Sequence, residues 1–150
     1  MRRCFGKFTP LIAGLLAGLL FAILVVPLIA QPAREFYNVR EEVTLSGTVS
    51  SVLRGPAPGM IWGGHLMIDT LHGKVDASLG RWGLEGKGAP TVKPGQQVEV
   101  TGIIKTVRNK EVLVTRTLKV NGKIYAMRTQ HGIAVSPQAR QRAAEKGEGQ

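Results

Sequence analysis

The hydrophobic pattern divides the chain into one long apolar run and a remainder in which apolar and polar residues alternate. Residues 11–30 are uncharged and almost entirely apolar. A helix of this length covers about 30 Å, the thickness of the hydrocarbon core of a bilayer. Arg2, Arg3 and Lys7 precede the run, and basic flanks favour the cytoplasmic side. We therefore predict a cytoplasmic segment over 1–10, a single transmembrane anchor in a bacterial inner membrane, and a periplasmic remainder.

A cleaved export signal is the alternative interpretation of residues 11–30. Signal peptides have an apolar stretch of about 7–15 residues that ends in small residues at an A-x-A site. Cleavage after Ala30 would place Leu28 where a small residue is needed, and cleavage after Ala33 would place Gln31 there. These residues favour a retained anchor over a product secreted to the periplasm.

Beyond a polar linker at 31–42, the pattern takes the two-residue period of β-strands. Residues 43–52 alternate apolar and polar, and Gly47 interrupts them as at a bulge or a strongly bent strand. Asn121-Gly122 is the clearest hairpin turn. Further strand-like stretches lie at 65–71, 74–79, 97–107, 111–120 and 123–128.

This arrangement predicts an all-β domain of five or six strands over 43–135, without a strongly amphipathic helix. Closure into a barrel would remove exposed strand edges, which a small sheet must protect. From residue 136 to residue 150 the chain is polar, charged and glycine-containing. We predict a disordered basic tail there, since it holds little to bury.

Two stretches resemble OB-fold proteins. The pattern from Val43 to Val52 is similar to their glycine-bent first strand, and Lys93 to Gly102 is similar to their fourth. Two further elements, Leu79-Gly80-Arg81-Trp82 and the hairpin from Asn121 to Arg128, resemble small exported bacterial modules of uncharacterised function. The resemblance implies a five- to six-stranded OB-like barrel, but a fold does not specify an activity.

The chain is strongly basic, with a formal net charge of +10 from 20 basic and 10 acidic residues. Only three basic residues and no acidic ones precede residue 31, so the charge belongs to the domain and its tail. Between residues 105 and 128 a single acid, Glu111, faces a concentration of cations. The basic residues are Lys105, Arg108, Lys110, Arg116, Lys119, Lys123 and Arg128. They predict a basic face that contacts an anionic partner, either an acidic protein or lipid head groups.

Single-stranded nucleic acid is an alternative anionic partner for a basic OB-like barrel. Such proteins stack bases on aromatic side chains, and Trp62 and Trp82 lie in glycine-rich stretches typical of exposed loops. The apolar run argues against this alternative because it directs the domain out of the cytoplasm. The tryptophans would otherwise cap the barrel or form a recognition surface.

A metal site is a second alternative, although no cofactor is required by the pattern. His65, Met67 and Asp69 share one face of a predicted strand. Imidazole with thioether suits copper(I), and imidazole with carboxylate suits zinc. Met67 would equally well fill the barrel core. A haem-handling role resembles that of OB-fold haem chaperones, but Tyr125 and His131 do not reproduce the order of their ligands.

Catalysis is not expected. The acidic residues are scattered, and the sequence contains no G-x-S-x-G, H-E-x-x-H or phosphate-binding glycine loop. The only cysteine, Cys4, precedes the apolar run, so the domain has no thiol nucleophile and no thiolate ligand. We predict a binding module rather than an enzyme.

Overall fold

The computed structural model describes residues 36–146. The predicted segments 1–10 and 11–30, with most of the linker, lie outside the described residues. Within the described part, no helix is both long and apolar enough to span a bilayer.

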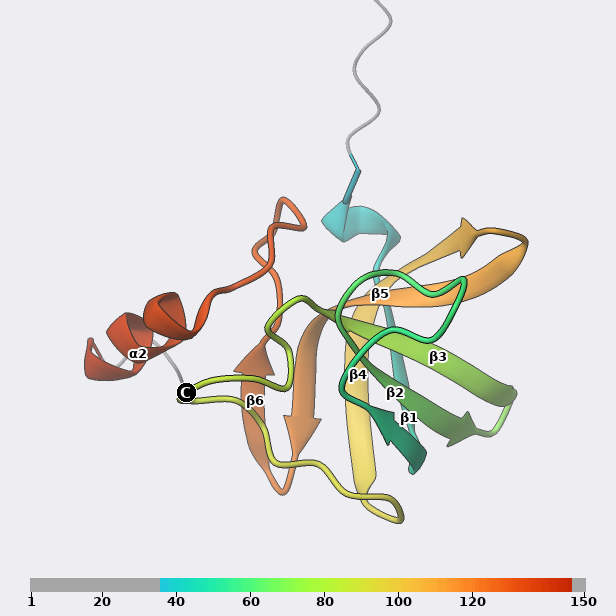
Figure 1. The fold of residues 1–150 in the computed structure, drawn as a ribbon, viewed down its shortest axis with the longest axis horizontal. Coiled ribbons are helices and arrows are strands. Elements are labelled where there is room, and N and C mark those ends of the chain that lie inside the picture. Colours follow the sequence, from blue (N-terminus) through green and yellow to red (C-terminus); the bar gives the residue numbers. More distant parts are fainter. Residues whose placement is uncertain (1–35, 147–150) are drawn as a thin grey trace, which may run out of the picture. The chain divides into compact units, whose positions relative to one another are not determined.

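Six strands make up most of the described chain (Figure 1). They are β1 (Val43–Leu53), β2 (Gly64–Thr70), β3 (Gly73–Gly80), β4 (Gln97–Val107), β5 (Lys110–Val120) and β6 (Lys123–Ala126). Hydrogen bonding follows the order β3-β2-β1-β4-β5-β6, and β3 also pairs in parallel with β5. This last pairing closes β1 to β5 into a barrel and leaves β6 outside, which confirms the prediction of a β-barrel.

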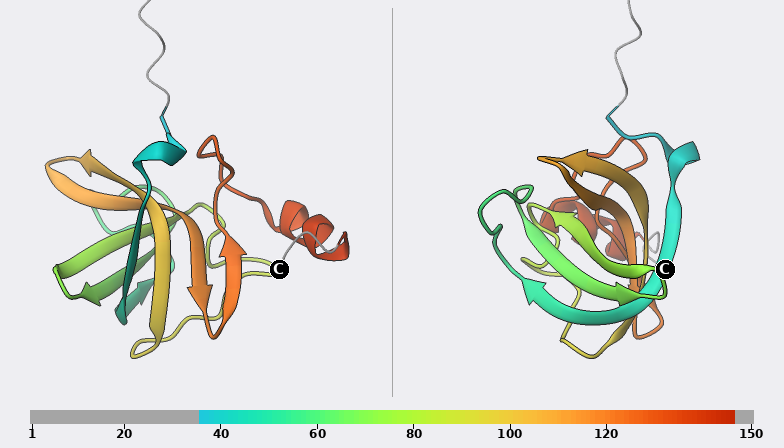
Figure 2. Two further views of the ribbon diagram at one scale, coloured as in Figure 1. Left: turned by 180° about the vertical axis from the view of Figure 1, so that it is seen from behind. Right: turned by 90° about the vertical axis from the view of Figure 1, so that its right-hand side faces the viewer.

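β1 curves strongly because it belongs to both halves of the barrel (Figure 2). Its residues Val43–Thr48 pair with β4, and Gly47–Leu53 pair with β2. Gly47 lies where the two pairings overlap, and a Cβ atom there would approach the Asp69 carbonyl oxygen to 2.4 Å. Gly47 is therefore required by close packing of the backbone, whereas the register shift of β1 comes slightly later, between Val49 and Ser51.

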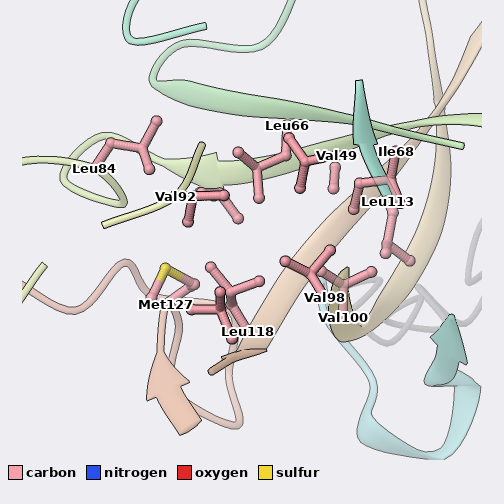
Figure 3. Close-up of a cluster of buried hydrophobic side chains, with 13 residues drawn as sticks. Val49, Leu66, Ile68, Leu84, Val92, Val98, Val100, Leu113, Leu118 and Met127 are labelled. Atoms are coloured by element: carbon pink, nitrogen blue, oxygen red, sulfur yellow. The ribbon is translucent and has the colours of Figure 1, made fainter. Parts of the chain in front are cut away.

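The barrel core is aliphatic, as the low aromatic content indicates (Figure 3). Inward-facing side chains from all five barrel strands meet there, with Leu84 and Val92 from the β3–β4 connection and Met127 after β6. The fully buried members include Leu66, Ile68, Val100, Leu113 and Leu118. Burial of each such side chain contributes about 1.5–3 kcal/mol to folding before the loss of chain entropy is counted.

A second, smaller cluster covers the outer side of β4 and β5. Tyr37, Ile103 and Val114 are buried in it, and Ile61 packs against them. Val114 points away from the barrel interior because it neighbours Leu113, which faces the interior, and successive side chains alternate across a strand. The last residues of the predicted linker, including the short 3-10 helix η1 (Val39–Glu41), are thus attached to the barrel.

The segment predicted to be a disordered tail contains the helix α2 (Pro137–Glu145). The Ser136 hydroxyl accepts a hydrogen bond from the Ala139 N–H and so caps its first turn. The Arg140 guanidinium donates to the carbonyl oxygens of Trp82, at 2.7 Å, and Glu85, at 2.8 Å. Arg140, which composition assigns to solvent, therefore attaches α2 to the β3–β4 connection, and the prediction of a disordered tail is wrong for this segment.

Candidate functional site

The seven predicted basic residues do not form one face. Arg108 lies in the β4–β5 turn and Lys110 begins β5 beside it, whereas Lys119 and Lys123 flank the β5–β6 turn. These turns lie at opposite ends of β5 (Figure 1), and an extended strand of that length measures about 30 Å. Their side chains are exposed, so the barrel presents two separate cationic ends.

Arg128 is not part of the surface, because only 7% of it is exposed. Its Nη1 donates to the carbonyl oxygens of Ser78 and Thr115, both at 2.8 Å. Burial lowers the pKa of Arg128 to about 10, which leaves it charged at neutral pH. The residue joins β3, β5 and the segment after β6, and its function is structural.

Arg116 is also not free to bind a partner, because its guanidinium forms a bidentate ion pair with Glu42. Nε contacts Oε1, and Nη2 donates to Oε2 at 2.7 Å. The buried Tyr37 hydroxyl donates to Glu42 Oε1 at 2.8 Å. The hydrogen bonds from Arg116 lower the pKa of Glu42 despite partial burial. Burial, followed by the hydrogen bond to Glu42, raises the pKa of Tyr37.

Three of the predicted basic residues are exposed and have no ion pair within 4.0 Å in residues 36–146, namely Arg108, Lys110 and Lys123. Lys105 Nζ is 3.8 Å from Glu41 Oε2, and Lys119 Nζ is 4.0 Å from Glu99 Oε1. Lys123 Nζ lies 5.3 Å from the centre of the Tyr125 ring, so the cations with neither kind of contact in this part of the chain are those at the β4–β5 turn. Arg108 also has a φ of 49°, a left-handed conformation that glycine and asparagine adopt more easily.

The other end of β5 borders an open hollow of about 510 Å³. Its lining includes Ser46, Gln97, Glu99, Lys119 and Asn121. The Glu99 carboxylate and the Lys119 ammonium group both line this hollow. Because their charges are opposite, the hollow is closer to neutral than the β4–β5 turn.

The two tryptophans occupy different environments. Trp62 is 70% exposed in the β1–β2 connection. Trp82 is half-buried in the β3–β4 connection, where the Arg81 guanidinium carbon lies 5.2 Å from its ring centre. Because the Trp82 carbonyl also accepts from Arg140, Trp82 helps to hold α2, whereas Trp62 is free to contact a partner.

The proposed metal ligands are separated by their partners. His65 is fully buried, with Nδ1 2.6 Å from Asp76 Oδ1 and Nε2 2.8 Å from the Ile61 carbonyl oxygen. Asp69 is exposed and lies 3.7 Å from Lys74 Nζ, while Met67 is half-buried. No group of three His, Cys, Asp or Glu side chains suited to a metal occurs within residues 36–146. Copper or zinc binding at His65, Met67 and Asp69 stays a prediction, and uptake would have to displace the two partners of His65.

The sequence did not identify Asp76 as the partner of His65, or Glu42 as the partner of Arg116. Asp76 was one of several acidic residues scattered along the chain, and Glu42 was placed in the linker. Asp76 is diagonal to His65 because Met67 pairs with Asp76 in the register of β2 and β3. A correct hairpin register would have placed Asp76 near His65, but no local signal connects Glu42 with Arg116.

Comparison with curated proteins found no match. Comparison with protein-family models matched the description "MamS/MamX magnetosome protein family" over residues 41–125. The match covers more than half of the 150 residues and includes the five barrel strands completely. This chain belongs to the MamS/MamX magnetosome protein family.

Proposed function

We propose that the chain is a membrane-anchored, outward-facing binding or scaffold module of this magnetosome family, and that it contacts an anionic partner. Residues 11–30 would serve as the anchor, and an OB-like barrel would serve as the binding domain. The partner would be an acidic protein or lipid head groups. Nucleic acid and a metal or haem ligand are the weaker alternatives.

The strand pairing supports the OB-like assignment. β1 lies between β2 and β4, and the parallel pairing of β3 with β5 closes a five-stranded barrel. The OB-fold is a small barrel of this size whose connections form its binding surfaces. In this chain the corresponding connections carry Trp62 and the exposed cations.

The observation that carries the proposal is the pair of exposed cations at the β4–β5 turn. Arg108 and Lys110 have no acidic partner among the described residues. Arg108 keeps its charge at a position with φ of 49°, where asparagine or glycine would be less strained. Exposed and uncompensated cations attract anionic surfaces and are screened by salt over about 8 Å.

A binding role is favoured over catalysis because the buried ionisable groups serve the barrel itself. His65 is bonded to Asp76 and Ile61, and Arg116 is bonded to Glu42. A general acid or base must instead reach the reacting atoms of a substrate. The groups with shifted pKa values therefore have structural roles in this proposal.

The test uses the full chain in nanodiscs of neutral lipid as bait. Vesicles containing an anionic phospholipid, a solubilised membrane extract and an oligonucleotide are offered separately at low and high salt. We expect capture at low salt that weakens at high salt and is lost in R108E/K110E. The matched control K119E/K123E makes the same charge change at the other end of β5 and should retain most binding.

Equal capture by the wild-type chain and R108E/K110E would overturn the role of this turn. Preferential capture of the oligonucleotide, with loss in Trp62→Ala, would favour nucleic acid instead, since each stacked base contributes about 1–3 kcal/mol.

A further inference from the structure

We infer that one end of the barrel docks on the bilayer surface through an exposed apolar patch formed by Phe36, Val39, Trp62 and Ile133. The inference rests on the proposed anchor, and it identifies lipid as the partner at this end of the molecule. The exposed fractions of these side chains are 63%, 44%, 70% and 66%.

Each of the four residues lies one or two chain positions from a residue that belongs to, packs against or closely approaches the small cluster around Tyr37. Phe36 precedes Tyr37, and Val39 follows it in η1. Trp62 follows Ile61, which packs against the cluster. Ile133 follows Gly132, where an added Cβ would lie 2.6 Å from the Tyr37 Cβ.

The ribbon views show how two of the segments that carry these residues are arranged. Figures 1 and 2 show η1 beside the loop that connects β6 to α2, at the end of the barrel where the chain enters it. The β2–β3 turn lies away from this end in every view. Leu71 in that turn is 99% exposed and therefore provides a matched residue outside the patch.

Two chain neighbours of the patch, Tyr37 and Ile61, are bonded to the barrel. Tyr37 is completely buried, and its hydroxyl donates to Glu42, which in turn binds Arg116 of β5. Ile61 accepts a hydrogen bond from the buried His65. Apolar side chains on such supports stay in water unless another surface covers them, and exposed apolar surface of this kind marks interaction sites.

Chain length indicates that this surface is the bilayer. Only residues 31–35 separate the apolar run from Phe36, and a connection of this length spans at most about 20 Å. An anchor over 11–30 therefore keeps the patch within that distance of the membrane. Tryptophan and phenylalanine are preferred where a protein meets the head-group region.

Nearby cations complement an anionic membrane surface. Arg40 of η1 is exposed, and Lys105 of β4 reaches η1 through Glu41. Arg108 and Lys110 continue along the same hairpin to the turn. Apolar and basic residues at one end form the combination by which peripheral surfaces bind anionic lipid.

The experiment places the full chain with Trp82→Phe in vesicles, so that Trp62 is the only tryptophan. Brominated lipids quench tryptophan at the bilayer surface, and iodide quenches tryptophan in water. We expect loss of Trp62 emission with brominated lipid and protection from iodide. The double variant F36S/I133S should reverse both effects, whereas L71S should change neither.

Alkaline carbonate washing separates the two proposals. A chain that is washed off the vesicles would overturn both the anchor and the docking inference. A chain that stays attached, with Trp62 open to iodide and insensitive to brominated lipid, would overturn docking alone. A third outcome is that Trp62 is protected from iodide only at high protein density and is not quenched by brominated lipid. That outcome would assign the patch to a second copy of the chain.

Discussion

Glu42 accepts two hydrogen bonds from Arg116, although the residues are 74 positions apart in the sequence. The side chains are 12% and 27% exposed. This ion pair joins the start of the barrel to the middle of β5, and Tyr37 adds a third hydrogen bond to the same carboxylate. The path from the proposed anchor into the barrel is consequently rigid from Tyr37 onward.

Glu42→Gln should lower the free energy of unfolding by about 2 kcal/mol, between the values for exposed and buried ion pairs. The control Glu41→Gln, in an exposed pair with Lys105, should change it by less than about 0.5 kcal/mol. Urea unfolding at neutral pH measures both. An equal effect of the two substitutions would show that the bidentate geometry of the Glu42–Arg116 pair does not add to the free energy of unfolding.

The same ion pair predicts acid sensitivity. The pKa of Glu42 is lowered in the folded state, so its contribution is complete above the unfolded value of about 4.3. That contribution is lost as the pH falls through the folded pKa. The wild-type chain should lose stability more steeply than Glu42→Gln below about pH 4, and parallel pH profiles would contradict the assignment.

His65 should give the stability a pH dependence opposite to that from Glu42. Burial alone would lower its pKa, but the hydrogen bonds to Asp76 and the Ile61 carbonyl outweigh burial and raise it, while Arg128 opposes them. Its stabilising effect is therefore complete below the unfolded value of about 6.5 and is lost as the pH rises through the folded pKa. Imidazole NMR should show His65 titrating above 6.5, and Asp76→Asn should move it downward. Amide protection factors at the β1–β2 connection, which remove the general rise of exchange with pH, should fall at the alkaline end.

Arg108→Asn should separate stability from binding. Asparagine tolerates the left-handed backbone at φ 49°, so relief of strain should raise the free energy of unfolding by up to about 1 kcal/mol. Loss of the cation should weaken capture of the anionic partner. Lys110→Gln removes one charge without relieving the strain at Arg108 and should weaken binding without added stability. A less stable Arg108→Asn would remove the argument from strain.

Gly47→Ala should destabilise the barrel by about 2–3 kcal/mol, since overpacking beside a backbone carbonyl forces the two strands apart. A Cβ at Gly47 would lie 2.4 Å from the Asp69 oxygen, whereas one at Gly55 would meet nothing within 4 Å. Gly55→Ala is therefore the matched control and should be neutral. Thermal unfolding followed by circular dichroism measures both, and equal midpoints would contradict the close approach of β1 and β2.

Local pattern was sufficient for most strands and their turns. Alternation placed β1, β4 and β5 correctly because the two-residue period depends only on neighbours in the chain. Asn121-Gly122 forms the predicted turn with φ values of 52° and 76°, which these two residue types adopt readily. The barrel followed from the number of strands and the need to protect their edges.

The roles of the charged residues were decided by tertiary structure. Arg128, Arg116 and Arg140 look like surface cations in the sequence, yet they bind Ser78, Glu42 and Trp82, which lie between 50 and 74 positions away. Even His65 depends on hairpin register for its contact with Asp76. Composition by itself determined that the domain is basic, because charge is a sum over residues. Which cations remain free for a partner depends on the carbonyl and carboxylate groups that folding brings beside them, and those groups come from distant strands.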